Sequence, residues 1–374
     1  MLNFNSIYKF YYEWWKNIDK ILFVLIMFLF SLGLFFSLVS TSLIASDKLD
    51  TNNYFFFFKH LVYIIIGITF LIFFSSLSRE NLFKISFYLF FVTLFFLFLV
   101  PVFGIEVKGS QRWLNFFFLP RFQPIELVKP FIIIFIATIL CSEKNFNIYF
   151  KYLLTFIAIL PVCILLMMQP DIGQTLLIFF AWIILVFISG ISLPIILTFL
   201  SFSLSSLVYI VFLIPKFAYI KNRILSFFNP SNGTHNFQSD KAIDAISSGS
   251  YFGKGIGEGT LKNRVPEAHT DYIISVISEE FGVVAIVLLL ILFLFFIYIV
   301  FKKIYLERSE KIKLVLTGSV CLIVFQVLIH IGVNIRLFPT TGMTLPFLSY
   351  GGSSIVGISI LSGIILNLTK REID

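Results

Sequence analysis

Long apolar runs recur along this chain and restrict it to one class of fold. Hydrophobic residues make up 59% of its 374 residues and charged residues 13%, whereas a soluble domain carries about 25% charged residues. A run of about 18 apolar residues can cross a bilayer as a helix. We therefore predict an all-α polytopic membrane protein with about ten transmembrane helices. These spans are expected at residues 20–44, 54–77, 82–103, 124–142, 150–168, 171–190, 192–214, 272–301, 313–336 and 344–369.

The last of these spans begins irregularly. Its first residues, PFLSYGGSS (346–354), include a proline and two glycines, so we expect this part to be broken or re-entrant. Such backbone is tolerated at membrane depth only where protein buries it or water reaches it. The whole segment FPTTGMTLPFLSYGGSS (338–354) is interpreted first as architectural and second as lining a substrate site.

The distribution of Lys and Arg predicts how the chain is oriented. In short loops these residues are concentrated on the side that holds the N-terminus, which is typical of the cytoplasmic side of a membrane protein. Ten spans return the C-terminus to the same side. The GSQRW loop (109–113), the long loop between spans seven and eight (about 215–271) and the FPTTGMTLP loop (338–346) then all face outward.

The ends of the chain and its charge fit this scheme. Residues 1–19 are aromatic and basic, which suits a segment lying at the headgroups, and 370–374 form a short cytoplasmic tail. One transmembrane domain, 20–369, occupies the rest. The net charge of +8 is assigned to orienting the chain and meeting anionic lipid, so no nucleic-acid partner is predicted.

The most polar cluster beside a span is RVPEAHTDYIISVISEEFG (264–282). Asp271 directly precedes an apolar run, where an Asp commonly serves as a helix N-cap. A cap alone does not account for Glu267, His269 and Asp271 within five residues. We therefore treat these three as candidate site residues, with the cap as the alternative for Asp271.

The fourth span also opens on polar residues, in QPIELVK (123–129). Glu126 and Lys129 are three residues apart and share one helix face, so a local ion pair is one interpretation. Ionisable groups inside a span also mark functional sites or interior pathways. Gln123 joins them as a candidate, and Arg112 in the preceding loop is expected to be exposed and suited to bidentate phosphate contact.

Two further segments are weaker candidates. In MMQPDIGQTLL (167–177), Pro170 can end one helix and Asp171 can cap the next, although Asp171 stays a candidate for substrate binding. The glycine-rich segment SSGSYFGKGIGEGTLKNRVPEAHTD (247–271) does not match a Walker phosphate-binding loop and is expected to be flexible. Before it, KFAYIKNRILSFFNP (216–230) predicts an amphipathic helix at the outer leaflet.

In order and spacing these motifs resemble those of the SEDS family of bacterial shape, elongation, division and sporulation proteins. The resemblance covers residues 20–369, and PEAHTD, QPDIGQT and TTGMTLPFLSYGGSS are most similar to the division branch. It implies a peptidoglycan glycosyltransferase that polymerises lipid II outside the bacterial cytoplasmic membrane during septal wall synthesis. It also implies a class B penicillin-binding protein and other division proteins as partners, and an essential aspartate at Asp271. QPIELVK departs from the family in lacking a small residue after QP.

The implied chemistry needs only one carboxylate to move a proton. Diphosphate is a good leaving group, so an acid on it is less necessary than in glycoside hydrolysis. Asp271 can act as general base toward the acceptor sugar hydroxyl. We assign Arg112 and Lys129 to the diphosphate, Glu126 to positioning Lys129, and Glu267 and His269 to orienting the loop or acceptor. No cofactor is certain; a divalent ion such as Mg²⁺ or Mn²⁺ is left open, and no metal ligands are assigned.

Three other functions are compatible with the residues. A lipid II flippase would also place charges inside a multispan bundle, although no internal repeat of the kind common in transporters is evident. If the protein is a non-catalytic scaffold for division proteins, Asp271 serves only as the N-cap of the helix that follows it. A polymerase of the elongation branch would carry out the same reaction elsewhere in the cell.

Overall fold

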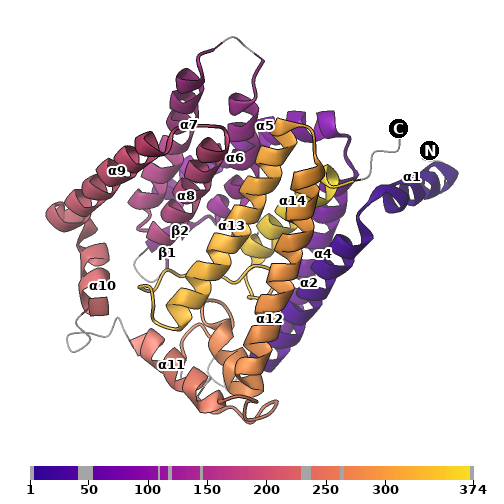
Figure 1. Ribbon diagram of the computed structural model, residues 1–374. Helices are drawn as coiled ribbons and strands as arrows, with labels where there is room; N and C mark the ends of the chain where they lie inside the picture. The colour runs from indigo at the N-terminus through magenta and orange to yellow at the C-terminus, as the bar shows by residue number, and fades with distance from the viewer. Residues whose placement is uncertain are drawn as a thin grey trace.

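The protein is a bundle of long helices (Figure 1). The computed structural model describes residues 4–40, 54–107, 110–116, 120–143, 146–228, 237–261 and 265–370. All ten predicted spans correspond to helices in that part of the chain. They are α2 (Lys20–Ser40), α4 (Phe55–Ser76), α5 (Arg79–Phe103), α6 (Pro124–Leu140), α7 (Ile148–Met168), α8 (Ile172–Ile188), α9 (Leu193–Leu213), α12 (Ile273–Leu306), α13 (Glu310–Asn334) and α14 (Gly352–Leu368).

Helix lengths divide the spans into two groups. Seven of the described helices are long and apolar enough to cross a membrane. The other three, α6, α8 and α14, have 17 residues each, or about 26 Å at 1.5 Å per residue, against a hydrocarbon core of about 30 Å. The expected break in the last span is confirmed, because α14 begins only at Gly352.

The outward faces of the bundle carry large apolar side chains. Phe58 of α4, Phe95 of α5, Phe202 of α9 and Leu294 of α12 are all more than half exposed. Such a surface is suited to lipid rather than to water. With the seven long helices, it identifies a multi-pass membrane protein.

Helix α14 is the buried centre of the bundle. Almost all of its residues are buried, and it packs against α4 and α6. Gly357 allows the close approach to α6, because a Cβ there would lie 2.4 Å from the backbone oxygen of Glu126. In a bilayer the hydrophobic effect does not drive helices together, so their association depends on close packing. Small residues at the contact allow the two backbones to approach closely.

Shorter elements lie at the ends and edge of the bundle. Figure 1 shows α1 (Phe4–Asn17) beside both marked termini and α11 (Phe237–Gly249) at the opposite end. Strands β1 (Ile105–Val107) and β2 (Ser110–Trp113) form an antiparallel hairpin. The helix predicted within 216–230 is present as α10 (Ala218–Phe228), after a 3₁₀ turn at Pro215–Phe217. Residues 41–44 of the first predicted span and 371–374 of the predicted tail lie outside the described residues.

The described part of the glycine-rich segment is bound to α12. Helix α12 breaks at Gly282, which has φ 78°. There the N–H of Val283 donates to the Ser250 carbonyl at 3.0 Å, and the N–H of Lys254 donates to the Glu279 carbonyl at 2.9 Å. The break leaves the Val283 N–H and the Glu279 carbonyl without partners inside the helix, and the segment forms hydrogen bonds with both.

The two acidic side chains of this helix, Glu279 and Glu280, also bind the segment. Glu279 is fully buried and accepts hydrogen bonds from the Leu261 N–H at 2.8 Å and from Lys254 Nζ at 3.3 Å. Glu280 accepts one from the N–H of Gly257. These carboxylates therefore bind the segment after α11 to the N-terminal part of α12.

Replacing Glu279 should release this segment. Glu279→Ala leaves the Leu261 N–H without its acceptor, which costs about 1–3 kcal/mol. We expect faster limited proteolysis within residues 250–261 and a lower melting temperature of the detergent-solubilised protein. Glu80→Ala, at the exposed Glu80–Lys84 pair, is the control and should leave both measurements unchanged. Equal proteolysis of the two variants would contradict the anchoring role of Glu279.

Candidate active site

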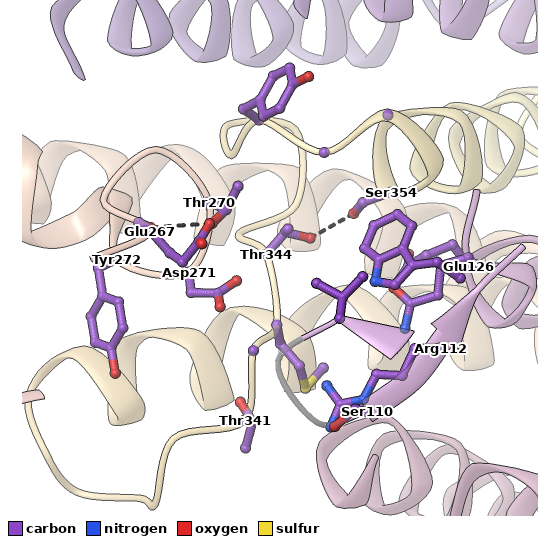
Figure 2. A pocket seen from close by; sticks show the side chains of 18 of the residues that line it. Ser110, Arg112, Glu126, Glu267, Thr270, Asp271, Tyr272, Thr341, Thr344 and Ser354 are labelled. Atoms are coloured by element: carbon purple, nitrogen blue, oxygen red, sulfur yellow. Dashed lines mark hydrogen bonds between the residues drawn. The ribbon is translucent and has the colours of Figure 1, made fainter. Parts of the chain in front are cut away.

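A cavity of about 1080 Å³ opens between β2, the N-terminal parts of α4 and α6, and the segments that precede α12 and α14. Its wall is mixed, with charged, hydroxyl and aromatic side chains (Figure 2). Of the eight predicted site residues, five line it: Arg112, Gln123, Glu126, Glu267 and Asp271. Segments far apart in sequence thus meet at one site.

Asp271 lies on the cavity wall and does not cap α12. The N-cap of that helix is Tyr272, without a side-chain hydrogen bond, so the cap alternative is wrong. The Asp271 N–H donates to the Glu267 carbonyl at 3.1 Å in a turn in which Glu267 has φ 57°. Figure 2 shows the Asp271 carboxylate pointing into the pocket.

Gly342 separates Asp271 from Arg112. A Cβ at this position would lie 3.6 Å from both Asp271 Oδ2 and Arg112 Nη1. Gly342 also has φ 72°, a conformation that side-chain-bearing residues rarely adopt. An acidic and a basic group therefore both border the space that a side chain at position 342 would occupy.

Arg112 is anchored rather than exposed, which corrects the prediction. Its side chain is 15% exposed. Its Nε donates to the Gln169 carbonyl at 3.2 Å and its Nη2 donates to the Pro170 carbonyl. Two of the guanidinium nitrogens thus bind the α7–α8 turn, and Nη1 lies beside Gly342.

Asp171 lies behind the cavity wall and holds parts of it in place. It caps α8 through the Gln174 N–H, at 3.4 Å, and its Oδ2 accepts from Gln123 Nε2 at 3.2 Å and lies 3.6 Å from Arg112 Nε. Asp171 therefore supports the two cavity residues instead of lining the cavity itself.

Glu126 and Lys129 form the local ion pair that the spacing allowed. Their side chains approach to 2.7 Å and both residues are buried. Gln174 Nε2 donates to Glu126 at 2.8 Å, and Lys129 Nζ donates to Gln326 at 3.1 Å. Glu126 reaches the cavity wall but Lys129 does not, so the assignment of Lys129 to a diphosphate is not supported.

His269 also lies away from the cavity. Its ring packs on Phe56 and Tyr350, with centroid distances of 4.9 and 5.8 Å. Glu267 lines the cavity, and its Oε2 accepts a hydrogen bond from the Thr270 hydroxyl at 3.2 Å. Glu267 is thus placed to meet a ligand, whereas His269 packs the loop against α4.

Three basic residues of the cavity were not predicted from the sequence, namely Lys59, Arg121 and Arg223. Arg223 of α10 donates to the Thr340 carbonyl at 2.8 Å. The three come from segments widely separated in sequence, so no local spacing links them. The sequence pattern that could have indicated Arg223 is the alternation of basic and aromatic residues in 216–230. It was interpreted as an amphipathic helix at the membrane surface.

Comparison with known proteins assigns the chain to a family. Residues 19–373 match the family named for FtsW, RodA and SpoVE and described as "Cell cycle protein". The chain belongs to this family. The expected resemblance to SEDS proteins is therefore confirmed.

Among curated relatives in this family, two proteins are each named "Probable peptidoglycan glycosyltransferase FtsW". The one from Caulobacter vibrioides is 31% identical over 96% of this chain and 91% of its own length. The one from Nitrosomonas europaea is 33% identical over 94% of this chain and 92% of its own.

Solved structures of the family share the fold. A chain from a structure titled "Structural coordination of polymerization and crosslinking by a peptidoglycan synthase complex" superposes with a TM-score of 0.76 at 29% identity, covering 94% of this chain and 97% of that chain. The rod shape determining protein RodA of Thermus thermophilus gives 0.69 at 27% identity, with 94% and 96% covered. The all-α fold predicted from the apolar runs is that of this family.

In this FtsW/RodA/SpoVE family member, a metal ion would have few protein ligands at the cavity. The described residues contain no group of three or more His, Cys, Asp and Glu side chains that could hold one. Glu267 and Asp271 both line the cavity, and Mg²⁺ is commonly held by one or two carboxylates together with substrate phosphates. Glu267 would supply a carboxylate ligand to a divalent ion that arrives with a diphosphate.

The support of Arg112 by Asp171 can be tested by Asp171→Asn. Removing one partner of a buried ion pair leaves an uncompensated charge, which costs about 3–5 kcal/mol. We expect a clearly lower melting temperature in detergent. Asp244→Asn, at the exposed Lys241–Asp244 pair, is the matched control and should melt like the parent protein. Identical melting of both variants would show that the Arg112–Asp171 contact contributes no stability.

Proposed function

We propose that this protein is a peptidoglycan glycosyltransferase that polymerises lipid II into glycan strands. The observation that carries the proposal is the Asp271 carboxylate, which lies beside Gly342, as the Arg112 guanidinium does, in a cavity of about 1080 Å³. That volume is slightly above the usual range for ligand pockets, about 300–1,000 Å³, which suits a large substrate. The names of the curated relatives support the same activity.

In the proposed reaction Asp271 is the general base. It accepts the proton of an acceptor sugar hydroxyl while the oxygen of that hydroxyl bonds to the anomeric carbon of the donor. The bond from that carbon to the diphosphate breaks, and the undecaprenyl diphosphate leaves with the bonding electron pair. One carboxylate suffices because the leaving group needs no added proton.

The negative charge of the leaving group requires nearby cations. Arg112, Arg121, Arg223 and Lys59 all line the cavity and are suited to bind phosphate oxygens. They replace Lys129 in that role, since Lys129 is buried against Glu126. A divalent ion held by Glu267 together with the substrate phosphates would supply further positive charge when bound.

An apolar hollow next to the cavity is the proposed site of the prenyl chain. It has a volume of about 630 Å³ and lies along the outward face of α4, lined by Tyr54, Phe58, Val62 and Ile66. Lys59, Tyr63 and Pro120 line both spaces. A substrate with its diphosphate in the cavity and its tail in this hollow would enter from the bilayer.

The cellular setting follows from the same proposal. Lipid II is presented outside the membrane, so the cavity faces outward, both termini are cytoplasmic, and 20–369 act as one transmembrane domain. We propose a class B penicillin-binding protein as partner, supported by the likeness to a chain of a peptidoglycan synthase complex. The FtsW names of the relatives favour septal synthesis with other division proteins over the elongation role.

Asp271→Asn tests the catalytic role. The amide keeps the size of the side chain but cannot take the proton, so we expect lipid II polymerisation to fall about 10²–10⁴-fold without a change in melting temperature. Polymer length and rate would be measured with purified protein in liposomes, with and without the partner. Asp244→Asn should retain the parent rate. Retained polymerisation by Asp271→Asn would refute the base assignment, and leaflet exchange of lipid II without polymer in the parent protein would favour a flippase.

The tail site can be tested by filling the hollow on α4. Val62→Trp should raise the KM for long-chain lipid II about tenfold, because buried apolar contacts to the tail are lost. The KM for a short-chain analogue should stay unchanged. Leu204→Trp, on the exposed face of α9, is the control for adding a bulky residue to the lipid-facing surface. An equal effect on both substrates would exclude this hollow as the tail site.

A further inference from the structure

The backbone around Asp271 is bound by donors from distant parts of the chain. The carbonyl of His269 accepts from the Tyr350 N–H at 3.0 Å, and that of Thr270 accepts from the Ser349 hydroxyl at 2.7 Å. The carbonyl of Asp271 accepts from Asn334 Nδ2 at 3.1 Å. Three consecutive carbonyl groups are thus satisfied by the end of α13 and the turn before α14.

Asn334 belongs to a polar stripe on α13. Gln326, His330 and Asn334 are four residues apart, so they lie on one face of the helix. Gln326 Nε2 donates to the Thr344 carbonyl at 2.9 Å, and His330 Nδ1 donates to the Met343 carbonyl at 2.7 Å. All three side chains are almost fully buried. Buried polar groups in a membrane bundle are costly, and here each one holds a carbonyl of the cavity wall.

Ser349 joins the two bound segments. Its hydroxyl donates to the Thr270 carbonyl and accepts the Leu345 N–H at 2.9 Å. The turn before α14 is therefore closed by the same oxygen that holds the Asp271 loop. Ser349 is 2% exposed, so water does not compete for these bonds.

We propose that Asn334 and Ser349 are positioning residues for Asp271, which hold the backbone on either side of its carboxylate. The inference rests on the proposed role of Asp271 as base. With the carbonyls of Thr270 and Asp271 and the Asp271 N–H all bonded, only the two side-chain torsions remain to place the carboxylate. A displacement of about 1 Å in such a group can cost about a hundredfold in rate, so loss of one donor affects the chemical step.

Ser349→Ala provides the test, with lipid II polymerisation measured as kcat and KM. We expect kcat to fall about tenfold or more, while KM changes less than about twofold because no substrate contact is removed. Ser349→Thr keeps the hydroxyl and should restore most of kcat. Ser362→Ala is the matched control, since Ser362 is buried in α14 and its hydroxyl has no partner among the described residues.

The outcomes separate this inference from the proposed function. If Asp271→Asn is inactive and Ser349→Ala has the parent kcat, the positioning role is refuted. A loss of melting temperature in Ser349→Ala that Ser349→Thr restores without restoring kcat would also refute it. If Ser349→Ala does not fold, Ser349→Cys, which keeps the volume with a weak donor, gives the same measurement. Activity retained by Asp271→Asn would instead overturn the proposed function itself.

Discussion

Irregular backbone beside a cavity persists inside a membrane protein only where every carbonyl and N–H finds a partner. In this protein the partners are buried side chains of α13, which donate to the carbonyls of Met343, Thr344 and Asp271. These bonds stabilise the irregular segment between α13 and α14 and hold it close to the start of α12. The cavity lies beside this segment.

Buried charges complete the walls in the same way. Arg112 and Asp171 approach to 3.6 Å, and Glu126 and Lys129 to 2.7 Å. Each pair also donates to or accepts from neighbouring amides or carbonyls, which reduces the cost of removing the charges from water. One member of each pair reaches the cavity and the other supports it from behind. At the cavity surface, Arg112 and Glu126 are thus each supported by a buried side chain of opposite charge, Asp171 and Lys129.

Much of the architecture was predictable because transmembrane helices are encoded locally. Apolar runs located all ten spans, and the sequence PFLSYGGSS indicated the break before α14. The prediction was incomplete where a segment depends on a distant partner. The segment 247–271 was expected only to be flexible, and nothing local indicated that its described residues bind the break in α12 at Gly282 and the buried carboxylate of Glu279.

The sequence alone determined the bundle, its polar segments and five of the residues around the cavity, because hydrophobicity and motif spacing are properties of neighbouring residues. Only the tertiary structure decided which polar groups face the cavity. In the structure the His269 ring packs on Phe56, and Lys129 pairs with Glu126. Lys59 and Arg223 both line the cavity. The physical reason is that a side chain's role in a bundle depends on partners from other helices, and their packing brings together residues that no local pattern connects.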